Sequence, residues 1–122
     1  MKTCLVVDDS RVIRLVARRI LEDLGYAVSE AENGEQALAR CSAAMPDAVL
    51  MDWNMPVLSG LEAVKRLRAM PGGDRPVVVF CTTENDPAQI AQAIEAGANE
   101  YIMKPFDGEI MRSKFLHAGL RP

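Results

Sequence analysis

Short apolar runs along this chain alternate with longer segments in which apolar residues recur at helical spacing. Five apolar runs rich in β-branched residues predict strands, over residues 2–7, 26–31, 47–52, 76–81 and 99–103. Residues 48–51 are apolar at successive positions, as a parallel strand buried on both faces requires. A helical segment follows each run. The pattern therefore predicts an α/β protein, with a five-stranded parallel sheet and helices on both faces.

Capping and breaking residues mark the ends of the predicted helices. The helices are expected to open near Ser10, Asn33, Ser59, Asp86 and Asp107. Pro87 at a first helical position supports Asp86 as a cap. Gly25, Gly97 and residues 71–73 end three of the helices.

The first predicted helix has an apolar face and a basic face. At about 100° per residue, the apolar residues that share one face are Ile13, Val16, Ala17, Ile20 and Leu24. Arg11, Arg14 and Arg18 fall on the opposite face with Leu15 beside them. We expect these four side chains to be exposed.

Size, charge and cysteines restrict the class of protein. The chain has 122 residues, a net charge of −3 and a pI near 5.1, which suit one compact domain and argue against a nucleic-acid-binding surface. No apolar run approaches the roughly 20 residues that span a bilayer. Three widely spaced cysteines predict buried reduced thiols and a cytoplasmic setting, and one histidine excludes a multi-histidine metal site. The chain ends soon after the fifth predicted helix, so we expect one domain over residues 1–122 with no output domain.

Polar residues stand where four of the predicted strands end. Asp8 and Asp9 follow the first strand, Asp52 ends the third, Thr82 follows the fourth and Lys104 follows the fifth. The carboxyl ends of parallel strands share one edge of the sheet, and ligands bind at that edge. We therefore expect these side chains to converge.

Three neighbouring carboxylates raise one another's pKa values unless a cation joins them. Lys104 supplies one positive charge, and Mg²⁺, which takes oxygen ligands, is the natural addition. A carboxylate in such a site can attack phosphorus and form an aspartyl phosphate. The metal and Lys104 would stabilise charge on the transferring group.

These residues and their neighbours resemble a known family. The segments that carry the resemblance are Val6-Val7-Asp8-Asp9-Ser10, Asp52-Trp53-Asn54-Met55-Pro56 with Gly60, Thr82, Tyr101 and Lys104-Pro105-Phe106. Over essentially its whole length the chain is similar to response-regulator receiver domains of two-component signalling, and most to stand-alone members of the chemotaxis type. The resemblance implies a flavodoxin-like (βα)5 fold with strand order 2-1-3-4-5.

The resemblance also implies how the acidic residues act. Asp52 would be the phosphoacceptor. Asp9, Asp52 and the backbone carbonyl of Asn54 would bind Mg²⁺ directly, and Asp8 would act largely through a metal-bound water. Asn54 and Glu84 would lie near the path of an attacking water and tune the lifetime of the phosphorylated state.

Other residues would bind the phosphoryl group or transmit its arrival. Lys104 would pair with the phosphoryl group, and the Lys104–Pro105 peptide bond would be cis. The Thr82 hydroxyl would move toward the phosphoryl group, and the Tyr101 ring would rotate into the space released. Thr83 is larger than the residue usual at its position in the family, so we expect access for a phosphodonor to be narrower.

The function implied is a phosphorylation-controlled signalling switch that assists its own phosphorylation and dephosphorylation and is not an enzyme in the usual sense. It would accept a phosphoryl group from a histidine kinase or phosphotransfer protein. It would signal to a target protein through the fourth helix, fifth strand and fifth helix, without nucleic-acid binding or membrane insertion. One hypothesis docks the histidine-containing domain of the kinase on Arg11, Arg14, Leu15 and Arg18; a nucleotide second messenger is an alternative ligand for the arginines.

Three other functions compete with this reading. An aspartate-nucleophile phosphatase usually carries a second aspartate two residues after the nucleophile, where this chain has Asn54. A receiver-like scaffold regulated without phosphorylation usually lacks some of the acidic or lysine positions. A flavodoxin-like cofactor binder would need a phosphate loop after the first strand, where this chain has two aspartates. The cognate kinase, the downstream partner and the oligomeric state stay open.

Overall fold

Within residues 1–83 and 86–120, which the computed structural model describes, five strands and five helices alternate as predicted. The strands are β1 (Thr3–Val7), β2 (Ala27–Ala31), β3 (Ala48–Asp52), β4 (Val77–Thr82) and β5 (Glu100–Met103). The helices are α1 (Arg11–Asp23), α2 (Gly34–Ala43), α3 (Gly60–Ala69), α4 (Pro87–Ala96) and α5 (Gly108–His117).

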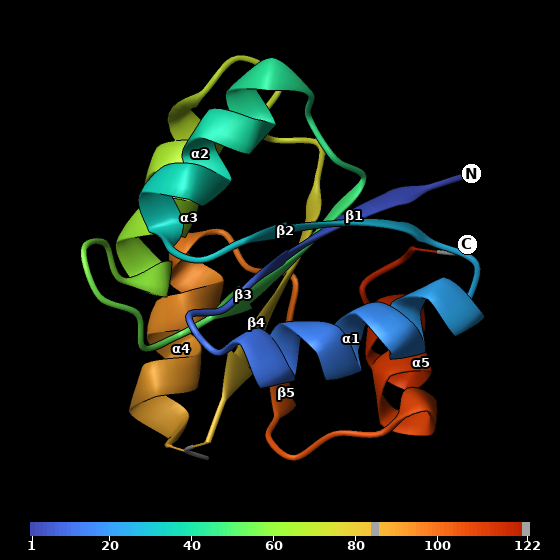
Figure 1. Ribbon diagram of the computed structural model, residues 1–122. Coiled ribbons are helices and arrows are strands. Elements are labelled where there is room, and N and C mark those ends of the chain that lie inside the picture. The colour runs from blue at the N-terminus through green and yellow to red at the C-terminus, as the bar shows by residue number, and fades with distance from the viewer. Residues whose placement is uncertain (84–85, 121–122) are drawn as a thin grey trace.

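The strands form one parallel sheet of order β2-β1-β3-β4-β5, which confirms the predicted flavodoxin-like topology (Figure 1). The register pairs Asp52 of β3 with Cys81 of β4, and Thr82 of β4 with Met103 of β5. The carboxyl ends of these strands therefore lie side by side at one edge of the sheet.

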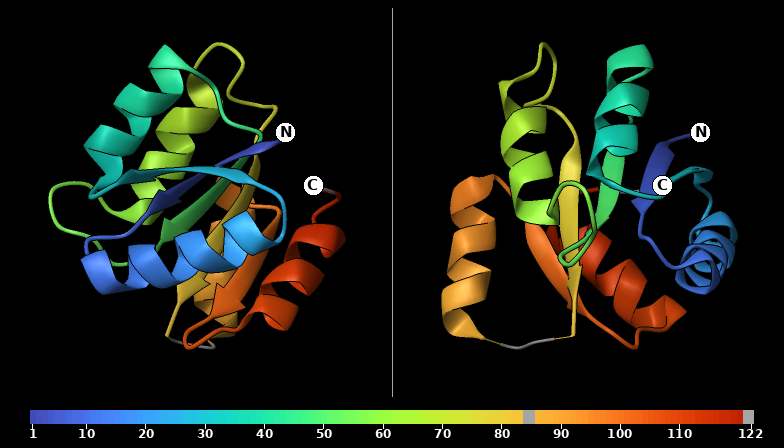
Figure 2. Two further views of the ribbon diagram at one scale, coloured as in Figure 1. Left: turned by 45° about the vertical axis from the view of Figure 1, so that its right-hand side comes forward. Right: turned by 60° about the vertical axis from the view of Figure 1, so that its left-hand side comes forward.

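Helices cover both faces of the sheet, with α1 and α5 on one face and α2, α3 and α4 on the other (Figures 1 and 2). Strand side chains alternate between the two apolar layers, as the pleat requires. In β1, Cys4 and Val6 pack in the layer of α1 and α5, whereas Leu5 and Val7 pack in the opposite layer. Every residue of β3 is buried, as expected for a central parallel strand.

Side-chain caps fix the start of each helix. The capping oxygens accept a backbone N–H at 2.9 to 3.3 Å, and they belong to Ser10, Asn33, Ser59, Asp86 and Asp107. These caps satisfy backbone donors that the helices themselves leave unpaired. Among the helices that the structure describes, none has the length and apolar composition of a membrane span.

Helix α1 is rotated relative to the sequence prediction. Arg14 was expected on the exposed face, but its exposed fraction is only 8%, whereas Val16, expected inside, is 43% exposed. A buried arginine needs a paired charge, and Glu30 on β2 supplies it, since its carboxylate binds both Arg14 and Arg18 on that side of the helix. Leu15 is exposed as predicted.

The three cysteines are buried free thiols, as predicted. Burial raises the pKa of Cys4 to about 12, of Cys41 to about 11 and of Cys81 to about 12. Thiolate is the reactive form of cysteine, so burial favours the less reactive thiol form of these residues at neutral pH.

Candidate functional site

Four strand ends bring charged and polar side chains together at one edge of the sheet. Asp8 follows β1, Asp52 ends β3, Thr82 ends β4 and Lys104 follows β5. One carboxylate oxygen from each of Asp8, Asp9 and Asp52 lies within 4.8 Å of the others. The structure thus places the three predicted carboxylates in one cluster.

Lys104 joins two of the carboxylates. Its Nζ lies 2.9 Å from Oδ2 of Asp8 and 3.0 Å from Oδ1 of Asp52. The backbone N–H of Lys104 also donates to the carbonyl of Thr82 at 2.8 Å, so the lysine is held at both ends. One ammonium group therefore offsets part of the charge of three carboxylates.

Protonation in the site reflects burial as well as charge. Burial raises the pKa of Asp52 above its usual value; the hydrogen bond from Lys104 lowers it, and the charges of Asp8 and Asp9 raise it further. Burial lowers the pKa of Lys104, but its hydrogen bonds to Asp8 and Asp52 raise that pKa well above its usual value. The lysine is therefore protonated at neutral pH, and a further cation beside Asp52 would lower the raised pKa of that carboxyl as Lys104 does.

The donor set fits a hard divalent cation. All three clustered groups offer carboxylate oxygens, the ligands that Mg²⁺ prefers. Asp8 and Asp52 are buried, whereas Asp9 is exposed, so the cluster opens to solvent on one side. A cation that keeps several of its waters suits such an opening.

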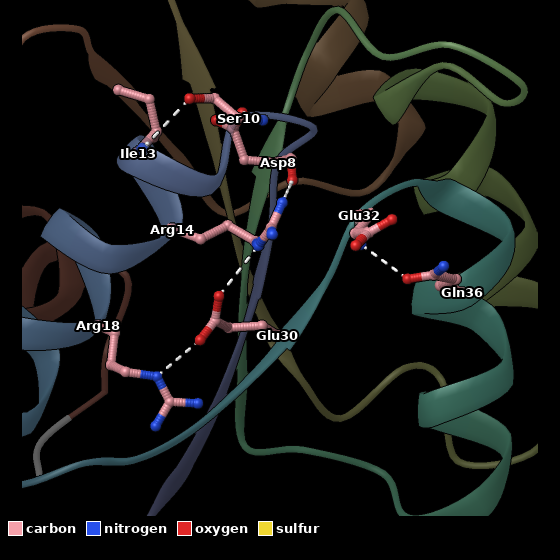
Figure 3. Close-up of polar contacts among 8 residues, drawn as sticks. All are labelled: Asp8, Ser10, Ile13, Arg14, Arg18, Glu30, Glu32 and Gln36. Atoms are coloured by element: carbon pink, nitrogen blue, oxygen red, sulfur yellow. Dashed lines mark hydrogen bonds and ion pairs between the residues drawn. The ribbon is translucent and has the colours of Figure 1, made fainter.

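Asp8 is held from three directions. Its Oδ1 accepts the backbone N–H of Ser10 at 2.9 Å, and its own N–H donates to Ala31 at 3.2 Å. Nη1 of Arg14 donates to its backbone carbonyl at 2.7 Å (Figure 3). The helical pattern of residues 11–23 does not predict this contact. The signal that the sequence offers is Glu30, near the end of an edge strand, which follows a helix with arginines spaced i, i+4.

The turn after Asp52 packs closely against the start of α3. The N–H of Trp53 donates to Cys81 at 3.0 Å, and the N–H of Gly60 donates to the Trp53 carbonyl at 3.2 Å. A Cβ atom on Gly60 would lie 2.1 Å from the carbonyl oxygen of Asp52. Only glycine fits at this position without displacing the backbone that carries Asp52.

Thr82 and Tyr101 border one small pocket beside the acidic cluster. The Thr82 side chain is only 6% exposed, and its hydroxyl donates to Oε1 of Gln89 on α4 at 3.4 Å. Nζ of Lys114 lies 4.4 Å above the centre of the Tyr101 ring, which is half-buried. The pocket beside Thr82 and Tyr101 is lined by Trp53, Phe80, Thr82, Gln89, Ile90, Ala93 and Tyr101.

The remaining site residues are more peripheral. The Lys104–Pro105 peptide bond is cis. Asn54 and Thr83 are exposed. Glu84, which the sequence reasoning linked to the lifetime of a phosphorylated state, lies outside the described residues.

Known proteins share both this fold and this sequence pattern. A family model described as the response regulator receiver domain matches residues 4–115. Chemotaxis protein CheY1 of Helicobacter pylori is 40% identical over 112 residues, which cover 90% of each chain. Chemotaxis response regulator CheY4 of Vibrio cholerae is 34% identical, with a TM-score of 0.89 over 97% of this chain and 98% of that one.

One solved relative holds a metal. The receiver domain of a sensor histidine kinase from Pseudomonas aeruginosa, whose structure has a magnesium ion coordinated in the active-site cleft, is 32% identical. Its TM-score is 0.86, and the match covers 98% of each chain. Since the family model spans every strand end from Asp8 to Lys104, the chain belongs to the response regulator receiver domain family of two-component signalling.

Proposed function

We propose that this chain is a phosphorylation-controlled signalling switch, a single receiver domain over residues 1–122 that accepts a phosphoryl group on Asp52. The position of Lys104 carries the proposal, because its ammonium contacts both Asp52 and Asp8, at 3.0 and 2.9 Å. A fixed cation beside a carboxylate nucleophile can stabilise the charge of a transferring phosphoryl group.

In the proposed reaction, a carboxylate oxygen of Asp52 forms a bond to the phosphorus of a phosphohistidine. The phosphorus–nitrogen bond breaks, and its electron pair stays on the imidazole of the donor protein. Lys104 donates a hydrogen bond to a phosphoryl oxygen while Asp8 holds the ammonium group. Attack of water on phosphorus later restores the Asp52 carboxylate and releases phosphate, so the protein assists both its phosphorylation and its dephosphorylation.

Asp8, Asp9 and Asp52, with the backbone carbonyl of Asn54, would hold Mg²⁺ in this reaction. When bound, the cation supplies positive charge that offsets the carboxylates and the phosphoryl oxygens. The all-oxygen donor set and the solvent-exposed position of Asp9 support this assignment.

The proposed switch couples Thr82 to Tyr101. A Thr82 hydroxyl that turns toward a phosphoryl group on Asp52 gives up its bond to Gln89, and the Tyr101 ring can then rotate into the space that the hydroxyl leaves. The surface of α4, β5 and α5 changes as a result. Ile94 and Ile110, which are exposed on α4 and α5, give that surface an apolar component for a downstream target protein.

Helix α1 is the proposed docking surface for the phosphodonor. Arg14 is buried and is excluded from that surface, whereas Arg11, Val12, Leu15 and Val16 are exposed. A Leu15→Asp variant should take phosphoryl groups from its kinase more slowly, yet react with acetyl phosphate at the wild-type rate. Equal slowing with both donors would contradict docking through α1.

The test of the proposed function uses Trp53, the single tryptophan, whose ring lies 5.1 Å from that of Phe80 beside the site. We expect its fluorescence to change with Mg²⁺ and again when acetyl phosphate or beryllofluoride is added. Intact mass should show one added phosphoryl group in the wild type and none in Asp52→Asn. A wild type that binds no Mg²⁺, or an Asp52→Asn variant that is phosphorylated like the wild type, would overturn the proposal.

A further inference from the structure

Arg14 is a buried arginine in the first turns of α1 that bonds in two directions (Figure 3). Its Nε donates to Oε1 of Glu30 at 2.9 Å, and its Nη1 donates to the backbone carbonyl of Asp8 at 2.7 Å. Arginine is rarely buried unless its charge is paired. The planar guanidinium presents its donors in a fixed fork, so the two contacts together fix the distance between Glu30 and Asp8.

Glu30, which accepts from this arginine, is itself held in a fixed position. It belongs to β2, where it is paired in register with Val6 of β1. Its second oxygen accepts Nε of Arg18 at 2.7 Å, so both carboxylate oxygens are bound. Burial raises the pKa of Glu30, but the hydrogen bonds from Arg18 and Arg14 outweigh that effect and lower it below its usual value. Glu30 is therefore ionised at neutral pH.

Arg14 also contacts Asp8, which is one of the three residues of the acidic cluster. The two carboxylate oxygens of Asp8 are bound by the N–H of Ser10 and by Lys104. Arg14 holds the Asp8 carbonyl, which is also the peptide group that leads into Asp9. Asp9 is exposed, so its position depends on the backbone that carries it.

We propose that Arg14 is a positioning residue for the cation site, which holds the Asp8–Asp9 backbone against β2 so that both carboxylates face Asp52. This inference rests on the proposed function, because it assumes that the cluster binds Mg²⁺. Arg14 would then contribute to the affinity of the site for Mg²⁺, and it would not belong to the docking surface on α1. Glu30 would act on the cation site indirectly, because it holds the Arg14 side chain.

The direction in which the affinity for the cation changes separates a positioning effect of Arg14 from a charge effect. If Arg14 acted only through its positive charge, its removal would leave Glu30 less neutralised and would strengthen the attraction of the site for a cation. If Arg14 acts through geometry, its removal weakens cation binding. Substitution by lysine keeps the charge but replaces the forked donor with a single ammonium, so it isolates the geometric contribution.

The experiment measures the dissociation constant of Mg²⁺ by Trp53 fluorescence in the full chain, together with the midpoint of thermal unfolding without Mg²⁺. The variants are Arg14→Lys and Arg14→Met. The matched control is Arg18→Gln, because Arg18 binds the same Glu30 carboxylate and otherwise Glu22 at 3.3 Å. If Arg14→Met does not fold, the dissociation constant of Mg²⁺ for Arg14→Lys alone tests the inference.

We expect Mg²⁺ to bind about tenfold more weakly to both Arg14 variants, a typical effect of losing a group that orients metal ligands, and within about twofold of wild type to Arg18→Gln. Wild-type affinity in Arg14→Lys, tighter binding in Arg14→Met, or equal weakening in Arg18→Gln would overturn the inference. A wild type that binds no Mg²⁺ would instead overturn the proposed function.

Discussion

Lys104 and Asp52 are 52 positions apart in the chain, yet Nζ of Lys104 lies 3.0 Å from Oδ1 of Asp52. Strand β4 separates β5 from β3 in the sheet, so the lysine side chain reaches across the end of β4. The same ammonium contacts Asp8, at the end of β1. One side chain thus links the ends of three strands through two charged hydrogen bonds.

Removing this link should slow phosphorylation. We expect Lys104→Met to react with acetyl phosphate about a hundredfold more slowly, the usual cost of losing one fixed group that stabilises transition-state charge. The rate of mass increase measures the effect. Lys65→Met, which removes an exposed lysine on α3, is the control and should react like the wild type. A wild-type rate in Lys104→Met would show that the lysine has no part in transfer.

The close approach at Gly60 predicts a large stability difference between two glycines. Gly60→Ala should lower the free energy of unfolding by more than about 2 kcal/mol, because the new Cβ would meet the Asp52 carbonyl. At Gly108, the first residue of α5, an added Cβ would lie 3.9 Å from Ile20, an ordinary contact. Gly108→Ala should therefore stay within about 0.5 kcal/mol of wild type. Urea unfolding compares the two variants, and similar losses in both would contradict the role given to Gly60.

The ion pairs of Glu30 predict a dependence of stability on acid. The usual pKa of a glutamate is 4.5, and that of Glu30 is lower in the folded protein because Arg18 and Arg14 donate to it, despite its burial. A carboxylate with a lowered folded-state pKa contributes stability above its unfolded value and loses it as the pH falls through the folded one. The Glu30 contribution is therefore complete above pH 4.5 and declines below it.

Glu30→Gln tests this directly. At pH 7 the variant should be less stable than wild type by about 1 to 2 kcal/mol, because hydrogen bonds to a charged acceptor contribute more than those to the neutral amide that replaces it. The difference should shrink as the pH falls below 4.5, as followed by urea unfolding over a pH series. Glu95→Gln, at an exposed position on α4, is the control. A stability difference between Glu30→Gln and wild type that grows toward acid pH would contradict the lowered folded-state pKa of Glu30.

Val57 predicts a stabilising substitution. This β-branched residue has a φ of 72°, in the left-handed region, and is 72% exposed in the turn between β3 and α3. That conformation costs most residues roughly 1 to 2 kcal/mol, whereas asparagine tolerates it. Val57→Asn should raise the free energy of unfolding by about 1 kcal/mol. Val12→Asn, at a similarly exposed helical position, should not raise it. A gain in both variants would show that replacing an exposed apolar side chain, and not the φ of Val57, is the cause.

Much of this architecture could be predicted because it depends on local pattern. Continuous apolar runs identified the buried strands, and the parallel topology placed the ends of β1, β3 and β5 together, which brought Asp8, Asp52 and Lys104 into one cluster. The N-caps could also be predicted, since the side chains of Ser10 and Asp107 accept the backbone N–H of residues only three positions away.

The orientation of α1 could not be predicted in the same way. Apolar periodicity placed Val16 inside and Arg14 outside, but the ion pairs with Glu30 reverse that order. Glu30 is 16 positions from Arg14, and only the packing of β2 beside β1 brings them together. Helical periodicity carries no information about such a partner, so the contact that holds Asp8 became visible only in the folded chain.

The dispersal of the acidic cluster over the whole chain has a consequence for how the protein is damaged and protected. Because Asp8 and Lys104 are 96 positions apart, no fragment cut from the middle of the sequence can retain a working cluster. A cation that binds only the folded cluster would stabilise the whole chain against unfolding by RT ln(1 + [cation]/Kd), and it would therefore protect every segment from proteolysis together.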